Sequence, residues 1–326
     1  MGLFKDRSEA KPAGFDLCLG DEKIRSAYDR AVAGGWEHLD DLFDSREDAW
    51  LVGQIFADEL SEVLVSTMAD WAEAAPSSTS VSMMGLTQVR DAWRYRGFAS
   101  DSEIDPEVQE QFVTRLELAD ASLTVARNLD TTAAAPWAAK IVTARDLGKG
   151  LKQLHECFDN AHAAEPFRPD ACAAMLQATS AKWGGSDEFM FDFARWIERE
   201  APPDAPAREA LPMAHLEKAI GSNDNGVKPS SYFVDSAVNH EVADAATSFL
   251  DAIGDKAEAM HLGALNTYLV ALFPLSRATT ALVERIISAI AGRPTPMPWR
   301  YYGDDISEGY RVVRKERREI ASRFGS

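Results

Sequence analysis

The stretch that decides the fold is "PWAAKIVTARDLGKGLKQLHECFDNAHAAEP", residues 136–166. Its apolar residues recur at the i, i+3, i+4 spacing of an amphipathic helix, first over 135–146 and again over 149–164. The glycines of "GKG" separate the two segments, and Pro166 closes the second one. The stretch therefore predicts two helices joined by a short turn.

The rest of the chain repeats this pattern, and no segment shows the alternating β-branched residues of a strand. We therefore predict an all-α protein. Further helices are expected at 20–33, 36–43, 46–58, 60–74, 79–98, 105–129, 169–183, 187–200, 206–219, 232–253, 257–273, 275–291 and 306–323.

Glycine, proline and small polar residues mark the connections between these helices. Gly184 and Gly185 are predicted to form a bend, after which Ser186 caps the next helix. The segment "GSNDNGVKPSS" reads as a longer break, and the three prolines of "GRPTPMPWRYYGDD" predict a loop without helix.

Several predicted helices end in the same way. Counting back 5, 8 and 12 residues from Pro76, Pro166 and Pro202 reaches nine apolar residues. These are Trp71, Met68, Leu64, Ala161, Phe158, Leu154, Ile197, Ala194 and Met190. A weaker fourth unit aligned on Asp130 gives Val125, Ser122 and Leu118 at the same inward positions.

Helix pairs of roughly 34 residues that a proline closes resemble tetratricopeptide (TPR) repeats. The segment 136–166 matches best, with Trp137, Phe158, Ala161 and Pro166 in the expected places, whereas Lys140 stands where a small or apolar residue is usual. The stretches "DAWRYRG", "APWAAKI", "AKWGGSDEFMFDFAR" and "PWRYYGDD" also resemble an uncharacterised bacterial family of TPR-like helical repeat proteins, which carries no assigned reaction.

The resemblance implies a right-handed solenoid of antiparallel helix pairs. With the breaks above, it predicts a flexible N-terminus (1–19), TPR-like repeats (20–220) and a C-terminal helical module (232–326) that ends in a basic helix.

The sequence also bears on where the protein is located in the cell. No run approaches the roughly 20 apolar residues of a membrane span, and the N-terminus lacks the apolar core of a signal peptide. The three cysteines have no CxxC pairing. We therefore expect a soluble, cytoplasmic protein with no membrane partner.

The net charge of −18 is unevenly distributed. Residues 1–130 carry 26 acids and 12 bases, and the stretch 36–62 alone has nine acids and one arginine, which would repel nucleic acid. Residues 310–324 instead carry six bases and two acids. They read either as a solvated amphipathic helix or as a clamp on an acidic surface, such as that of a second copy in a homo-oligomer.

No catalytic, metal or cofactor motif stands out. His155 and His162 lie seven residues apart, which is not the i, i+4 spacing of a helical zinc site. "NHEVAD" lacks the second histidine of HExxH, and GxSxG, P-loop and GxGxxG motifs are missing. We therefore predict no catalytic residues, no metal and no cofactor.

The first helices of the predicted pairs would line the concave face of the array. The helices over 79–98, 135–146 and 169–183, with the adjoining Arg168, carry a net charge of +4. The candidate binding residues on this strip are Arg90, Arg94, Lys140, Arg145 and Lys182. They would bind an acidic peptide or a carboxylate. The alternative is that they pair with neighbouring acids and hold the array together.

Trp299, Tyr301 and Tyr302 form an aromatic cluster inside the proline-rich loop. They would cap the helical stack or, alternatively, form an exposed binding patch.

The leading function is a non-catalytic interaction module or scaffold for a protein or peptide. One alternative is an immunity-type neutraliser that binds a basic toxin through the acidic N-terminal half, and another is a helical enzyme with an unrecognised site.

Overall fold

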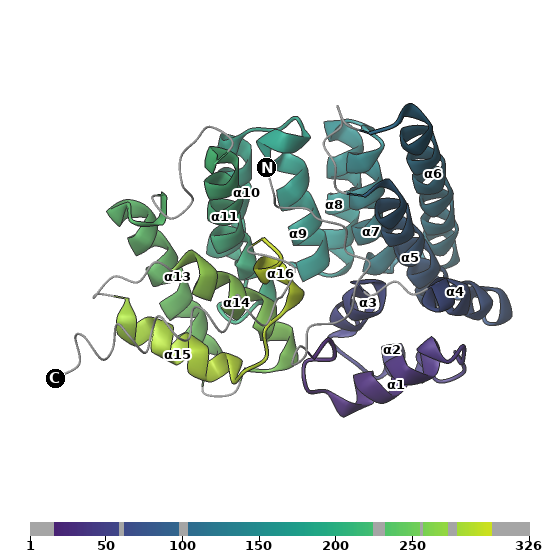
Figure 1. Cartoon of the computed structure of the whole chain (residues 1–326), viewed down its shortest axis with the longest axis horizontal. Coiled ribbons are helices and arrows are strands. Elements are labelled where there is room, and N and C mark those ends of the chain that lie inside the picture. Colours follow the sequence, from purple (N-terminus) through teal and green to yellow (C-terminus); the bar gives the residue numbers. More distant parts are fainter. Residues whose placement is uncertain are drawn as a thin grey trace. The chain divides into compact units, whose positions relative to one another are not determined.

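The computed structural model describes residues 16–58, 62–97, 104–223, 232–254, 257–272 and 279–301. All regular structure in these ranges is helical, which confirms the all-α prediction (Figure 1). The predictions for residues 1–15, Tyr302 and the basic helix 306–323 lie outside the described residues. No helix in the described ranges is long and apolar enough to cross a membrane.

The chain divides into two compact units, residues 21–185 and residues 1–20 with 186–326. We call them the N-terminal and C-terminal units. The helices of the N-terminal unit are α1 (Glu22–Val32), α2 (Leu39–Asp44), α3 (Ala49–Asp58), α4 (Glu62–Ala74), α5 (Ser78–Arg96), α6 (Pro106–Leu129), α7 (Ala134–Asp146), α8 (Leu151–Ala164), α9 (Pro169–Thr179) and the 3-10 turn η2 (Ala181–Trp183).

Helix α7 is the centre of the N-terminal unit. It contacts α5, α6, α8 and α9, so that α5, α7 and α9 follow one another in one layer, with α6 and α8 packed against them. Helix α6 crosses α5 closely at Gly85, where an added Cβ would lie 2.7 Å from the Leu123 side chain. On the side of α5 away from α6, α3 covers the helix, since Gly53 of α3 faces Met83 and Leu86.

The nine aligned apolar positions are all buried, none of them more than 6% exposed. The alignment of the fourth unit on Asp130 is one residue too early, because Val125 and Leu118 are 52% and 58% exposed. Counting back from residue 131 instead reaches Ala126, Leu123 and Ala119, which are fully buried. A helix repeats every 3.6 residues, so a shift of one residue rotates a position by about 100° around the axis.

The double glycine closes the N-terminal unit as the sequence indicates. Gly184 adopts the left-handed conformation (φ 87°) after η2, and the Ser186 hydroxyl accepts the Phe189 amide at 3.1 Å to cap the following helix. An added Cβ on Gly185 would overlap the Thr179 carbonyl oxygen, so only glycine fits there.

The C-terminal unit comprises α10 (Asp187–Glu200), η3 (Pro206–Glu209), α11 (Ala210–Asn223), α13 (Ser236–Ile253), η4 (Ala259–His261), α14 (Leu262–Ala271), α15 (Thr280–Ile290) and α16 (Pro296–Trp299). Helix α14 is its core, because α11, α13, α15 and α16 all contact it. Since α11 packs on both α10 and α14, the boundary between the units falls after Gly185 and not near residue 220 as predicted.

Within the proline-rich loop, the four residues of α16 do not form a regular helix, because Met297 has an extended backbone (φ −90°, ψ 141°).

We predict that Gly185→Ala lowers the free energy of unfolding by roughly 3 kcal/mol or more, because the new methyl group collides with backbone that cannot move aside cheaply. Gly148→Ala is the matched control: Gly148 has φ 61° but no atom near its missing Cβ, so this change should cost only about 1 kcal/mol. Urea unfolding followed by circular dichroism measures both. If the two variants lose the same unfolding free energy, the backbone around Gly185 must move aside easily, and the prediction is wrong.

Candidate functional site

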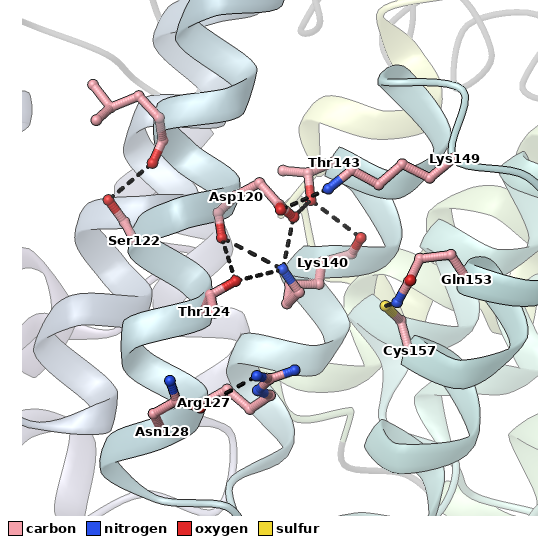
Figure 2. Close-up of polar contacts among 11 residues, drawn as sticks. Asp120, Ser122, Thr124, Arg127, Asn128, Lys140, Thr143, Lys149, Gln153 and Cys157 are labelled. Atoms are coloured by element: carbon pink, nitrogen blue, oxygen red, sulfur yellow. Dashed lines mark hydrogen bonds and ion pairs between the residues drawn. The ribbon is translucent and has the colours of Figure 1, made fainter.

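A polar cluster joins α6, α7 and the turn before α8 (Figure 2). The Asp120 carboxylate accepts hydrogen bonds from Lys140 Nζ at 2.7 Å, Lys149 Nζ at 2.6 Å and Thr143 Oγ1 at 2.7 Å. Lys140 also donates to Thr124 Oγ1 at 2.9 Å. One carboxylate on α6 therefore holds two lysines.

Lys140 explains why this cluster exists. It lies on the central helix α7 and is 6% exposed, and a buried ammonium group is costly without an opposite charge and hydrogen-bond acceptors. Burial by itself raises the pKa of Asp120, but the hydrogen bonds from Lys140, Lys149 and Thr143 outweigh it and lower the pKa to about 2. The Asp120 carboxylate is therefore charged at neutral pH.

A cleft of about 210 Å³ opens beside this cluster, lined by Asp120, Arg127, Lys140, Ala144, Lys149, Gln153, Glu156 and Cys157. Three cations face two carboxylates, which leaves the lining with one surplus positive charge.

Two of the cations have donors to spare. Lys149 is 36% exposed and spends one of its three N–H donors on Asp120. Arg127 stacks over the Trp137 ring at 5.0 Å and donates to Asn128 at 3.2 Å. A guanidinium and an ammonium group at one cleft are suited to binding a carboxylate or another oxyanion.

The cleft is not set up for cysteine chemistry. Cys157 is buried and receives a weak contact from Gln153 Nε2 at 3.7 Å (Figure 2). Burial raises the pKa of its thiol, which disfavours the reactive thiolate.

The five predicted binding residues do not share the cleft, since Lys140 alone lines it. Arg90 donates to Gln54 of α3 at 2.9 Å, and Arg94 pairs with Asp91 at 2.7 Å. Helix α3 therefore contacts α5 at Arg90, whereas the Arg94 side chain stays about half-exposed.

The other two predicted residues lie away from the cleft. Arg145 pairs with Asp146 at 2.7 Å and stacks over Trp183 at 4.2 Å, whereas Lys182 is exposed on η2. Arg168, the flanking base, pairs with Glu165 and Asp170. Most of the strip thus pairs with neighbouring acids, as the alternative interpretation expects.

Sequence reasoning missed Asp120, Arg127 and Lys149. A signal was present, because Asp120, Thr124 and Arg127 follow one another at i, i+4, i+7 and form a polar stripe on α6. A lysine at an inward position of the next helix needs an acid from such a stripe.

Trp299 is not part of an exposed aromatic patch. It is 1% exposed, and its indole donates to Asn266 Oδ1 on α14 at 2.6 Å. Tyr301 donates to Glu217 at 2.5 Å, and burial raises the pKa of its hydroxyl. Trp299 therefore belongs to the core of the C-terminal unit, and Tyr301 is half-buried beside it in the chain.

A second polar cluster lies in the C-terminal unit. One ring nitrogen of His215 faces the Tyr232 hydroxyl at 2.8 Å and the other faces Glu241 at 3.2 Å, while Arg195 pairs with Glu241 at 2.7 Å. Burial, with Glu241 nearby, raises the pKa of Tyr232 to about 12, so this cluster does not supply a phenolate at neutral pH. We interpret it as a structural network.

The histidines of "HECFDNAH" and "NHEVAD" have structural or surface positions. His162 accepts the Phe167 amide at 3.1 Å, whereas His155 and His240 are exposed. Among the described residues, no group of three His, Cys, Asp or Glu side chains is placed to hold a metal.

No protein-family model matches the chain, and no curated protein or solved structure matches it either. The resemblance to TPR-like proteins therefore stays a prediction.

The low pKa of Asp120 gives a testable pH dependence. Since the pKa is lower in the folded state than in the unfolded chain, the carboxylate stabilises the fold above the unfolded value of 3.8, and this contribution is lost as the pH falls towards 2. Carbon-13 NMR of the labelled Asp120 carboxyl should show a titration midpoint near 2. A midpoint at or above 3.8 would contradict the three hydrogen bonds.

Proposed function

We propose that this protein is a non-catalytic interaction module that binds an acidic side chain or a chain-terminal carboxylate of a partner protein in the cleft between α6, α7 and α8. The observation that carries the proposal is the charge of the cleft, where Arg127, Lys140 and Lys149 face Asp120 and Glu156. In a chain of net charge −18, such a local excess of cations favours an anionic ligand.

The division of labour among the cations supports this assignment. Lys140 is held by Asp120 and Thr124 inside the unit and serves to position the acid. Lys149 and Arg127 are the more accessible pair and would contact the ligand. A carboxylate bound by arginine accepts two parallel hydrogen bonds, which gives both strength and orientation.

The arrangement of the helices also supports a binding role. We propose that the successive pairs of the N-terminal unit form a TPR-like array, an architecture that presents surfaces to partners. In this proposal the binding surface is the α6–α7–α8 cleft and not the strip with Arg90, Arg94, Arg145 and Lys182.

The neutraliser remains the second candidate, and one observation favours it. Glu37, Asp41, Asp44 and Glu47 are exposed around α2, so part of the acidic stretch faces solvent. Other acids of the stretch are used internally, since Asp48 pairs with Arg46 at 2.7 Å. Binding of a basic partner there would depend on the exposed acids and not on the cleft.

We predict that a short fluorescent peptide rich in glutamate binds more tightly than the same peptide with glutamine, measured by fluorescence anisotropy. Arg127→Gln together with Lys149→Gln should weaken binding on the order of tenfold or more, because each removes a charged hydrogen-bond donor. Glu156→Gln should instead strengthen binding, since it removes a repelling carboxylate from the lining.

Lys152→Gln is the matched control, because Lys152 is exposed on α8 but does not line the cleft. It should bind as the wild type does. Equal binding of both peptides, or an unchanged affinity in the Arg127/Lys149 variant, would overturn the proposal.

A further inference from the structure

Helix α6 has two apolar faces. Its first face, with Phe112, Leu116, Ala119, Leu123 and Ala126, is buried and packs against α5. Its second face carries Leu118, Val125 and Leu129 at i, i+7, i+11, and these side chains are 58%, 52% and 50% exposed. Ala121 is exposed between them. We call these four residues the outer stripe of α6.

Among the described residues, α4, α8 and α10 each expose a single large apolar residue, Val63, Leu151 and Phe189, whereas the outer stripe of α6 has three in one row. Every helix position that the repeat alignment marks as apolar on α4, α8 and α10 is buried. On α6 the buried set is complete without the stripe, so its apolar residues are not needed for packing inside the unit. A row of large apolar side chains on solvent is typical of a surface that meets a partner.

The length of the stripe fits a helical partner. From Leu118 to Leu129 the helix advances about 16 Å, or three turns. A second helix that places apolar residues at i, i+3 or i+4, and i+7 would cover this length along its own apolar side.

The charges beside the stripe indicate what kind of partner helix would bind there. At about 100° per residue, Glu117 lies beside the start of the stripe, and Glu110 continues the same side about 12 Å before Leu118; both are exposed. On the other side of the stripe, Arg115 shares the Asp91 carboxylate with Arg94 and stacks over Tyr95. Arg127 is turned towards Trp137 of α7. The side of the stripe with Glu110 and Glu117 is therefore acidic.

We propose that the outer stripe of α6 binds an amphipathic helix of a partner protein whose apolar side is flanked by lysine or arginine. The apolar residues would be buried against Leu118, Val125 and Leu129, and the basic residues would face Glu110 and Glu117. Pairing with the same stripe of a second copy is disfavoured, because that stripe carries the same acids.

This surface is separate from the carboxylate-binding cleft. Asp120, Thr124 and Arg127 face α7, whereas the stripe lies on the solvent side of the same helix. The inference therefore goes beyond the proposed function and does not depend on it.

The probe is a labelled amphipathic peptide of leucine and lysine. The control peptide carries glutamate in place of each lysine. We predict that the lysine peptide binds the full-length protein in fluorescence anisotropy and that the glutamate peptide does not. Leu118→Ser with Val125→Ser should weaken binding at least tenfold. Glu110→Gln with Glu117→Gln should weaken it severalfold and reduce its dependence on salt.

Leu151→Ser is the matched control, since Leu151 is 55% exposed but lies on α8. It should bind the lysine peptide as the wild type does, and thermal unfolding should show that all variants remain folded. The proposal is overturned if the Leu118/Val125 variant binds like the wild type or if the glutamate peptide binds equally well. It is also overturned if light scattering finds a dimer that this variant converts to a monomer, because a second copy would then occupy the stripe.

Discussion

The N-terminal unit depends on one ion pair, between Lys140 of the central helix α7 and Asp120 of α6. A lysine that is 6% exposed would be strongly unfavourable without a counter-charge, so α6 must place Asp120 opposite it. The same carboxylate reaches Lys149 just before α8 at 2.6 Å. A single acid therefore fixes how three consecutive helices meet and creates the charged cleft beside them.

This constraint also decides which basic residues remain for a ligand. Other basic residues of the unit form ion pairs with nearby acids. Arg145 pairs with Asp146, and Arg168 pairs with Glu165 and Asp170. Lys149 and Arg127 sit at the edge of the cluster, where solvent reaches them, and keep unused donors. Helix α6 thus has three different sides: an apolar one against α5, a polar one towards α7, and the outer stripe.

The sequence predicts local structure far better than it predicts the site. Helical periodicity, the bend at Gly184 and the cap at Ser186 are set by neighbouring residues, and the structure confirms them. The partnership of Asp120 with Lys149 joins residues far apart in the chain, so spacing alone does not reveal it. The misaligned repeat on α6 has a similar cause, because its apolar residues lie on two faces and either face fits the pattern. The sequence leaves open whether Trp299 is exposed, because its burial depends on packing against α14, where its indole donates to Asn266.

The most direct test of the account is a double-mutant cycle on the central ion pair, with unfolding free energies measured for Asp120→Asn, Lys140→Met and the double variant. Asp120→Asn should be the costlier single change, on the order of 3–5 kcal/mol, because it strands Lys140 in the interior and leaves Lys149 without its acid. Lys140→Met should cost less, since Asp120 keeps Lys149. The double variant should then lose less unfolding free energy than the sum of the two single losses, by at least ~1 kcal/mol. Additive losses, or a smaller loss for Asp120→Asn than for Lys140→Met, would contradict the claim that this pair organises the unit.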